Sequence, residues 1–417
     1  MNLSFYSSFL NGLANQEAQI STLQQQISTG STVQNAAQNP AAYETAALAS
    51  DQITQLTNDS TTQSAVQTQL GAANSAYGSM SSLLDSVQSV VEQGLNGATN
   101  AENLNALADQ IQSSSQQLLS LGNTQLPDGN YLFGGTRNNI PPFQIDSTGT
   151  TPGGVAYYGD SGQSQVNIDG GITANALVSG NVLTSALSGD GTSFVQAATA
   201  NTGTAEMTQQ GLSNVQQANA FQASGSPITV AFVLIPGTSA MGYTLTQGSG
   251  QNAQILTPKP VPLSTTAGEG TGVTLDGVNY QISGAPAVGD SFTISPSRPQ
   301  TAFTLLQNIA TALSGSRDTP AQIAQTNQSL SQSLAGLNQY QQTVTTAEAQ
   351  NGVTMQALSN AQTNTSAQKN SAQNTINNAT SVNMPAAITA LNQTMSAIEA
   401  SMKTFAEAQS LSLFKYL

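Results

Sequence analysis

The sequence predicts a mainly α-helical fold with a β insertion: long antiparallel coiled-coil helices from both termini carry a central β-rich outer head. Two observations predict this class. Near both ends, apolar residues recur at alternating spacings of four and three, the seam of a coiled coil. In the middle of the chain the apolar period changes to two and glycines and prolines multiply, which is typical of short strands joined by turns.

The composition argues against several classes of function. Only 7% of the 417 residues are charged, the net charge is −14, and no Trp, Cys or His occurs. Without His or Cys there is no Ser-His-Asp triad, no thiol nucleophile and no ordinary zinc site, so we expect no enzyme, no cofactor and no metal. An acidic chain whose first basic residue is Arg137 would be repelled by phosphate backbones, so we expect no nucleic acid partner.

The beginning of the chain lacks the pattern of a secretory signal. That pattern needs a basic start followed by a continuous apolar run, and residues 1–19 have neither. No later apolar stretch is long enough to cross a bilayer, so we expect no membrane insertion. If the protein acts outside the cell, it needs a route that does not depend on a cleavable signal peptide.

An amphipathic axial helix is predicted within residues 1–38. Gly30 ends it, because glycine readily adopts the left-handed conformation that closes a helix. The seam is interrupted once, by Gln16. Its apolar members are Phe9, Leu13, Ile20, Leu23 and Ile27.

Residues 39–133 are predicted to form a long helix and a shorter helix that returns along it. A long helix over residues 41–95 would measure roughly 80 Å at 1.5 Å per residue. Thr99 and Glu102 have the spacing of a capping box, which starts the return helix. Tyr131–Phe133 then reads as the first strand.

Residues 134–300 are predicted to form the β-rich head. Asp276-Gly277 joins two strands as a tight hairpin, because this dipeptide suits a two-residue turn. A polar stretch with helical character over residues 192–221 separates two groups of strands, so the head is open to division into two small subdomains. The predicted strands are Val155 to Tyr158, Val166 to Ile168, Ile228 to Ile235, Tyr243 to Thr246, Val273 to Leu275, Val278 to Ile282 and Phe292 to Ile294.

The C-terminal part mirrors the N-terminal part. Over residues 301–380, apolar spacing predicts a helix from Phe303 to Leu313, and Thr319-Pro320 starts a second long helix as cap and first-turn proline. Residues 381–417 form the C-terminal axial helix, whose spacing is strictly four and three. Its apolar residues are Met384, Ile388, Leu391, Met395, Ile398, Met402 and Phe405, followed by Leu413 in the apolar tail.

The elements therefore follow the same order from either end, which places both termini at one pole. A lone amphipathic helix cannot bury its stripe in water, so each terminal helix needs the other or a neighbouring subunit. The core of a monomeric bundle is the ordinary explanation of any such seam. For the terminal seams we favour contact between subunits, because nothing else in the chain is left to cover them. We predict that these seams form an assembly interface.

Three stretches resemble a known family. Residues 23–30, with Val33 and Asn39-Pro40-Ala41, are similar to the family's N-terminal signature. Residues 130–135 are similar to the strand that enters its head, and residues 411–417 to its apolar C-terminal tail. The chain thus resembles the superfamily of flagellins and hook-associated proteins, most closely the branch that joins hook to filament. The resemblance is good at both ends and thin in the middle.

The resemblance implies a non-enzymatic building block of the extracellular bacterial flagellum. Subunits would form a ring that continues the helical lattice at the hook-filament junction, with the terminal helices as the inner tube. The implied partners are further copies of the chain, hook-associated protein 1, flagellin and a cytosolic export chaperone that masks the C-terminal seam. Type III export of the unfolded chain is also implied. Two positions depart from the family pattern, since Gln38-Asn39 and Asn383 replace acidic residues.

Two alternatives stay open. The first is flagellin, the filament subunit, although the segments YLFGG and LSLFKYL favour the junction branch. The second is a coiled-coil adhesin or phage fibre, which predicts a signal peptide or a trimeric seam; the predicted antiparallel hairpin argues against it.

Three aspartates beside glycines raise the question of calcium. Asp160, Asp169 and Asp190 have this context, but neither the EF-hand pattern nor the repeat of a calcium-binding roll is present. We therefore interpret them as turn residues.

Overall fold

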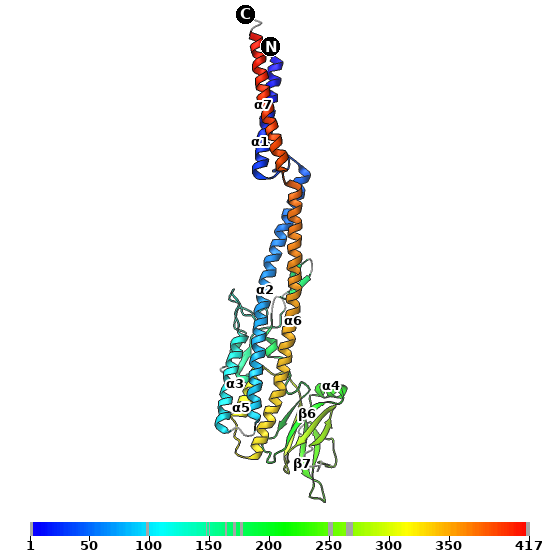
Figure 1. The fold of residues 1–417 in the computed structure, drawn as a ribbon. Helices are drawn as coiled ribbons and strands as arrows, with labels where there is room; N and C mark the ends of the chain where they lie inside the picture. The colour runs from blue at the N-terminus through cyan, green and yellow to red at the C-terminus, as the bar shows by residue number, and fades with distance from the viewer. Residues whose placement is uncertain are drawn as a thin grey trace. The chain divides into compact units, whose positions relative to one another are not determined.

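The chain folds as a mainly helical protein with an antiparallel β region, as its sequence predicts. This computed structural model describes residues 3–96, 100–146, 148–149, 151–162, 165–169, 172–175, 178–248, 253–263 and 270–413. The α-helices are α1 Leu3–Thr29, α2 Pro40–Leu95, α3 Ala101–Gly122, α4 Val215–Ser224, α5 Ala302–Leu313, α6 Pro320–Thr380 and α7 Met384–Leu413 (Figure 1). Among the described helices, none combines the length and apolar character needed to cross a bilayer.

The two longest helices begin at proline. Pro40 and Pro320 are the first residues of α2 and α6, a position where a missing N–H costs no helical hydrogen bond. Before α6, Thr319 and Gln322 form a reciprocal capping box. The Gln322 N–H donates to Thr319 Oγ1 at 3.2 Å, and the Thr319 N–H donates to Gln322 Oε1 at 3.0 Å.

Contacts divide the chain into two compact units. The first comprises Met1–Ser64, Ile168–Ile172 and Ser359–Leu417, and the second comprises Ala65–Asn167 and Thr173–Leu358. Both α2 and α6 contribute to each unit, and in each unit they pair antiparallel.

In the first unit, a buried glutamine fixes the register of α2 against α6. Gln63 Nε2 donates to Thr365 Oγ1 at 2.9 Å and also to the carbonyl oxygen of Ile168. Gln63 Oε1 is buried and has no hydrogen-bond partner among the described residues. A slip of the helices would leave the whole amide unpaired, so this contact specifies one register.

In the second unit, α3 and α5 pack together beside the same helices and close the main core. Met80, Val87, Ile111, Leu118 and Ile309 are fully buried there. Burial of each such side chain contributes about 1.5–3 kcal/mol. This core is the largest apolar cluster of the described residues and anchors the return helix that the sequence predicts.

Hydrogen bonds from side-chain amides also connect α2 to α6 in the second unit. Asn351 Nδ2 donates to the Leu70 carbonyl oxygen at 2.9 Å, and Gln341 Nε2 donates to Asp85 Oδ1 at 2.7 Å. These residues interrupt the apolar seam of α6, and the structure shows that they pair within the chain.

The β region contains short antiparallel strands. Five strands follow the order β10-β8-β7-β13-β5, with β9 on β8, and a second sheet has the order β11-β12-β6. Smaller pairs are β1-β2 and β3-β4. The strands are β1 Phe143–Ile145, β2 Val155–Tyr157, β3 Gln165–Asp169, β4 Ile172–Asn175, β5 Ser193–Ala197, β6 Glu206–Leu212, β7 Ile228–Leu234, β8 Met241–Gln247, β9 Gln254–Ile255, β10 Val261–Pro262, β11 Thr271–Leu275, β12 Val278–Ser283 and β13 Ser291–Pro296.

The predicted hairpin turn is confirmed. Asp276 and Gly277 have φ angles of 44° and 79°, and they join β11 to β12. Both positive angles match the turn that Asp-Gly favours. A second apolar cluster fills the head, where the rings of Phe232 and Phe292 meet edge to face at 6.0 Å.

Three local predictions were wrong or fell outside the description. Tyr131–Phe133 is not a strand; Tyr131 makes a single bridge to Gln125 and the chain turns. Residues 192–221 are not one helical stretch, because β5 and β6 precede the short α4. Thr99 lies outside the described residues, and Asn100 caps α3.

Deleting side-chain volume in the main core should destabilise the second unit. Ile111→Ala removes a fully buried side chain, so we expect a loss of about 2–5 kcal/mol in unfolding free energy, measured by urea titration. Ile145, which is 72% exposed, provides the control: Ile145→Ala should change stability by less than about 0.5 kcal/mol. Equal effects of the two substitutions would contradict the assignment of this core.

Candidate assembly interface

The terminal helices are joined through their linkers. The Thr32 N–H donates to the Thr380 carbonyl oxygen at 2.6 Å, and the Val382 N–H donates to the Gly30 carbonyl oxygen at 3.0 Å. Gly30 has a φ of 71°, the left-handed conformation predicted for the end of this helix. These bonds hold the end of α1 beside the start of α7, and the two helices then pack antiparallel (Figure 1).

Part of the predicted seam lies between α1 and α7. The rings of Phe9 and Phe405 stack with centroids 4.1 Å apart and planes 9° apart, and Tyr6 contacts Phe405 at 5.9 Å. Tyr6 is not among the predicted seam residues, although it lies seven residues before Leu13 in the same row. The predicted members that are half-buried in this unit are Phe9, Leu13, Ile20, Leu23, Ile27, Leu391, Ile398 and Phe405.

The other predicted members of α7 remain exposed. Met384, Ile388, Met395 and Met402 have exposed fractions of 39%, 45%, 45% and 50%. Ile388, Met395 and Met402 are spaced by seven residues, and we call these three residues the outer row; Met384, at the start of the helix, is in line with Leu391. The side chain of Leu413, the last predicted member, lies outside the described residues.

Helix geometry explains the division of the α7 seam. At 3.6 residues per turn, the row containing residues 391, 398 and 405 is offset by roughly 60° from the row containing residues 388, 395 and 402. A single partner helix such as α1 covers the first row. The second row belongs to the same apolar face and stays exposed in this unit.

Charge contributes little to this surface. Over the whole of α1 the only charged residue is Glu17, and over α7 the charged residues are Glu399, Lys403 and Glu407. Contacts on this surface must therefore select partners by shape and by amide or hydroxyl hydrogen bonds.

The two departures from the family pattern act as helix caps. Asn39 Oδ1 accepts from the Ala42 N–H at 3.1 Å at the start of α2, and Asn383 Oδ1 accepts from the Ala386 N–H at 3.2 Å at the start of α7. Gln38 Oε1 accepts from the Gln34 N–H at 2.7 Å within the linker. Neutral side chains thus make the contacts that a carboxylate cap makes.

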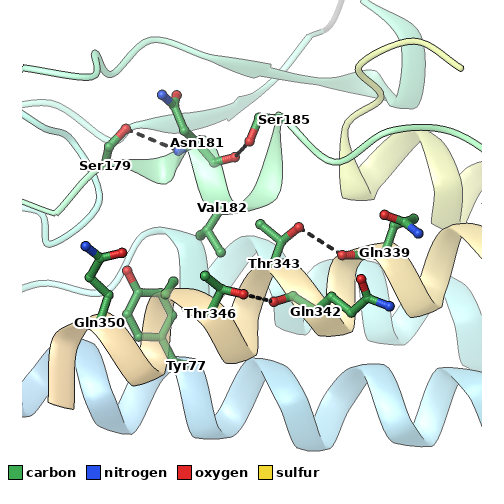
Figure 2. Close-up of a pocket in the computed structure, with 11 residues that line it drawn as sticks. Tyr77, Ser179, Asn181, Val182, Ser185, Gln339, Gln342, Thr343, Thr346 and Gln350 are labelled. Atoms are coloured by element: carbon green, nitrogen blue, oxygen red, sulfur yellow. Dashed lines mark hydrogen bonds between the residues drawn. The ribbon is translucent and has the colours of Figure 1, made fainter. Parts of the chain in front are cut away.

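A groove in the second unit is a separate candidate site. It has a volume of about 500 Å³ and lies between α6 and the 3₁₀ turn Gly180–Leu183, with Tyr77 of α2 beneath (Figure 2). Burial raises the pKa of Tyr77 to about 12, so the phenol is protonated at neutral pH. Apart from Tyr77, its lining residues are Ser179, Asn181, Val182, Ser185, Gln339, Gln342, Thr343, Thr346, Ala347 and Gln350, which supply no carboxylate or cation. This lining offers no acid-base pair for catalysis.

Two of the glycine-flanked aspartates cap turns. Asp160 accepts from the N–H groups of Thr136 and Gly162 at 2.8 and 2.9 Å, and the hydrogen bond from the Thr136 hydroxyl is the main cause that lowers its pKa. Asp190 accepts from the Thr192 N–H at 2.9 Å. The side chain of Asp169 lies outside the described residues. Within the described part of the chain, no three Asp, Glu, His or Cys residues form a potential metal site.

The cap of α7 can be tested by substitution. Asn383→Ala removes the acceptor for the Ala386 N–H, so we expect a loss of about 1 kcal/mol and faster exchange of the first-turn amides of α7. Asn383→Asp keeps the acceptor and adds a charge that the helix dipole favours, so it should match or exceed the wild type. Thermal unfolding followed by circular dichroism, combined with hydrogen exchange, measures both effects; identical results for Ala and Asp would contradict the capping role.

Comparisons with known proteins agree with this architecture. Residues 2–138 match the family of the bacterial flagellin N-terminal helical region. Flagellar hook-associated protein 3 of Salmonella typhimurium (strain LT2) is 25% identical over 181 residues, which are 41% of this chain and 57% of that protein. The same protein of Escherichia coli (strain K12) matches with equal identity and coverage. The match therefore spans little more than half the length of these curated relatives.

Solved structures share the fold. Flagellar hook-associated protein-3 from Legionella pneumophila superposes with a TM-score of 0.72 at 22% identity, over 79% of this chain and 98% of that one. FlgL from Xanthomonas campestris superposes with a TM-score of 0.66 at 24% identity, over 80% and 99%. Residues 2–138 thus resemble the bacterial flagellin N-terminal helical region, and in sequence and fold the chain is similar to flagellar hook-associated protein 3.

Proposed function

We propose that the chain is a structural, non-enzymatic junction protein that connects the flagellar hook to the flagellin filament. Its terminal helices join a helical lattice, contacting further copies of the chain, hook-associated protein 1 on the hook side and flagellin on the filament side. Similarity to flagellar hook-associated protein 3 supports the location. The division into axial helices 1–38 and 381–417, long-helix segments 39–133 and 301–380, and head 134–300 is part of this proposal.

The outer row of α7 is the observation that carries the proposal. Three large apolar side chains remain at least 45% exposed on a helix whose neighbouring row already contacts α1. Neighbouring exposed apolar side chains of this kind typically mark a site of protein-protein contact. In a lattice, a terminal helix of an adjoining subunit would cover them.

Before assembly, the outer row would also be a binding site for an export chaperone. Two of its three members are methionines, whose flexible thioether side chains adapt to different partner surfaces. A cytosolic chaperone bound to this face would keep it from aggregating until export. Assembly would then replace the chaperone with neighbouring subunits on the same residues.

Polar substitution of the outer row tests the assembly role. We expect the triple variant Ile388→Gln, Met395→Gln and Met402→Gln to keep the α1–α7 contact, because the half-buried row is unchanged, but to reduce filament attachment at least tenfold. The measurement is the number of attached filaments per cell by electron microscopy, in a strain expressing only the variant. Val353→Gln, at an α6 side chain that is 72% exposed, is the matched control. Normal attachment in the triple variant would refute the proposal.

Loss of the gene separates the junction role from that of a filament subunit. A strain lacking this chain should still build hooks and should release unattached flagellin into the culture medium, because the filament would have no base to grow on. If the chain were the filament subunit, its loss would remove that secreted protein itself. Immunoblots of medium and cell fractions, with electron microscopy of hooks, distinguish the two results.

A further inference from the structure

Two strands of the head have an edge that faces α6. In the described sheets, β5 forms a backbone ladder only with β13, and β6 only with β12. The two strands lie near each other, and the Ser193 hydroxyl of β5 donates to Gln209 Oε1 of β6 at 3.3 Å. Along each outer edge, backbone N–H and C=O groups point away from the sheet. Such an edge is a template for adding a further strand unless something blocks it.

Glutamine side chains of α6 occupy these edges. Gln328 Oε1 accepts from the Met207 N–H of β6 at 2.7 Å, and Gln328 Nε2 donates to the Met207 carbonyl oxygen at 2.9 Å. Gln332 Oε1 accepts from the Val195 N–H of β5 at 3.1 Å. Gln328 therefore presents an amide to Met207 as a neighbouring strand would present a peptide group.

The same face of α6 continues the pattern beyond the two strands. Gln325 Nε2 donates to the Asn201 carbonyl oxygen at 3.0 Å, and Gln339 Nε2 donates to the Asp190 carbonyl oxygen at 2.8 Å. The four glutamines are spaced by three, four and seven residues, so they lie on one side of the helix. We call Gln325, Gln328, Gln332 and Gln339 the glutamine row.

The chemistry of the row fits an edge better than charged side chains would. A primary amide both donates and accepts, whereas Lys only donates and ionised Glu only accepts. Gln328 and Gln332 are 2% and 5% exposed, and burial of an unpaired charge there would be costly. The strands themselves carry little protection, because β5 has no charged residue or proline and β6 has only Glu206 at its start.

We propose that the glutamine row is a latch that closes the edges of β5 and β6 against strand addition by a second copy of this chain. A second copy is the natural occupant, because two identical open edges can pair antiparallel about a twofold axis. The proposal concerns the head and the residues of α6 that contact it, and it does not depend on the function of the terminal helices.

Opening the latch provides the test. The full-length variant Gln328→Leu with Gln332→Leu removes both edge contacts and keeps side chains of similar size. Its control is Asn338→Leu with Gln342→Leu, which adds two leucines at exposed positions of the same helix with the same spacing of four. Hydrogen exchange is measured at the Val195 and Met207 amides, which the latch contacts, at several protein concentrations. Analytical ultracentrifugation measures the oligomeric state at the same concentrations.

At low concentration, we expect the Val195 and Met207 amides to exchange at least tenfold faster in the opened variant than in the control. As the concentration rises, the opened variant should dimerise and the protection of Met207 should return, because a strand from the second copy replaces Gln328. Unchanged exchange would refute the latch. Dimers that leave Met207 unprotected, or a folded variant that associates no more than the control, would refute strand addition.

A conservative variant guards against simple loss of folding. Gln332→Glu, measured at a pH low enough to keep the buried carboxyl neutral, keeps an oxygen that accepts from the Val195 N–H, so it should retain protection of that amide, whereas the single variant Gln332→Leu at the same pH should lose it. If the double variant does not fold, as judged by circular dichroism, this pair decides the question for β5. Equal exchange of Val195 in Gln332→Glu and Gln332→Leu would overturn the proposal.

Discussion

The antiparallel pairing of α2 with α6 is the constraint on which the rest of the structure depends. These helices come from opposite halves of the chain, and a few buried amides specify their register in each compact unit. Because they pair, the linkers beyond them meet, and the linkers in turn bring α1 and α7 together. The same pairing closes the main core, and α6 supports the outer edges of two head strands.

Much of this arrangement could be predicted from the period of apolar residues. Long stripes at spacings of four and three identify helices reliably, and Asp276-Gly277 identified its hairpin because both residues tolerate positive φ. The strands β5 and β6 escaped prediction because SFVQA is short, EMTQQGL is mostly polar, and both strands depend on contacts from α6. The sequence of residues 131–133 predicts a strand, but these residues lie in a turn, because the side chains of Leu132 and Phe133 pack into the main helical core.

The candidate interface was only partly predictable, for a geometric reason. In sequence, Ile388 and Leu391 are equivalent members of one seam, and only the position of α1 decides which of them is covered. The glutamine row carries no apolar signal at all, because amides that bind a backbone look like ordinary surface residues in a sequence. Most of the specific contacts described above are made by uncharged amide, hydroxyl and apolar side chains. Because the chain has no histidine, the charge of these contacts does not change as the pH crosses the neutral range.

The hydrogen bonds between the N-terminal and C-terminal halves of the chain also determine the order in which the chain can fold during synthesis. Thr32 and Thr380 are 348 residues apart, Gln63 and Thr365 are 302 apart, and Leu70 and Asn351 are 281 apart. A nascent chain that has emerged only through its head still lacks the partner for each of these N-terminal residues. The pairing of α2 with α6 therefore waits for the last quarter of translation, and until then these three contacts between the halves of the chain are missing.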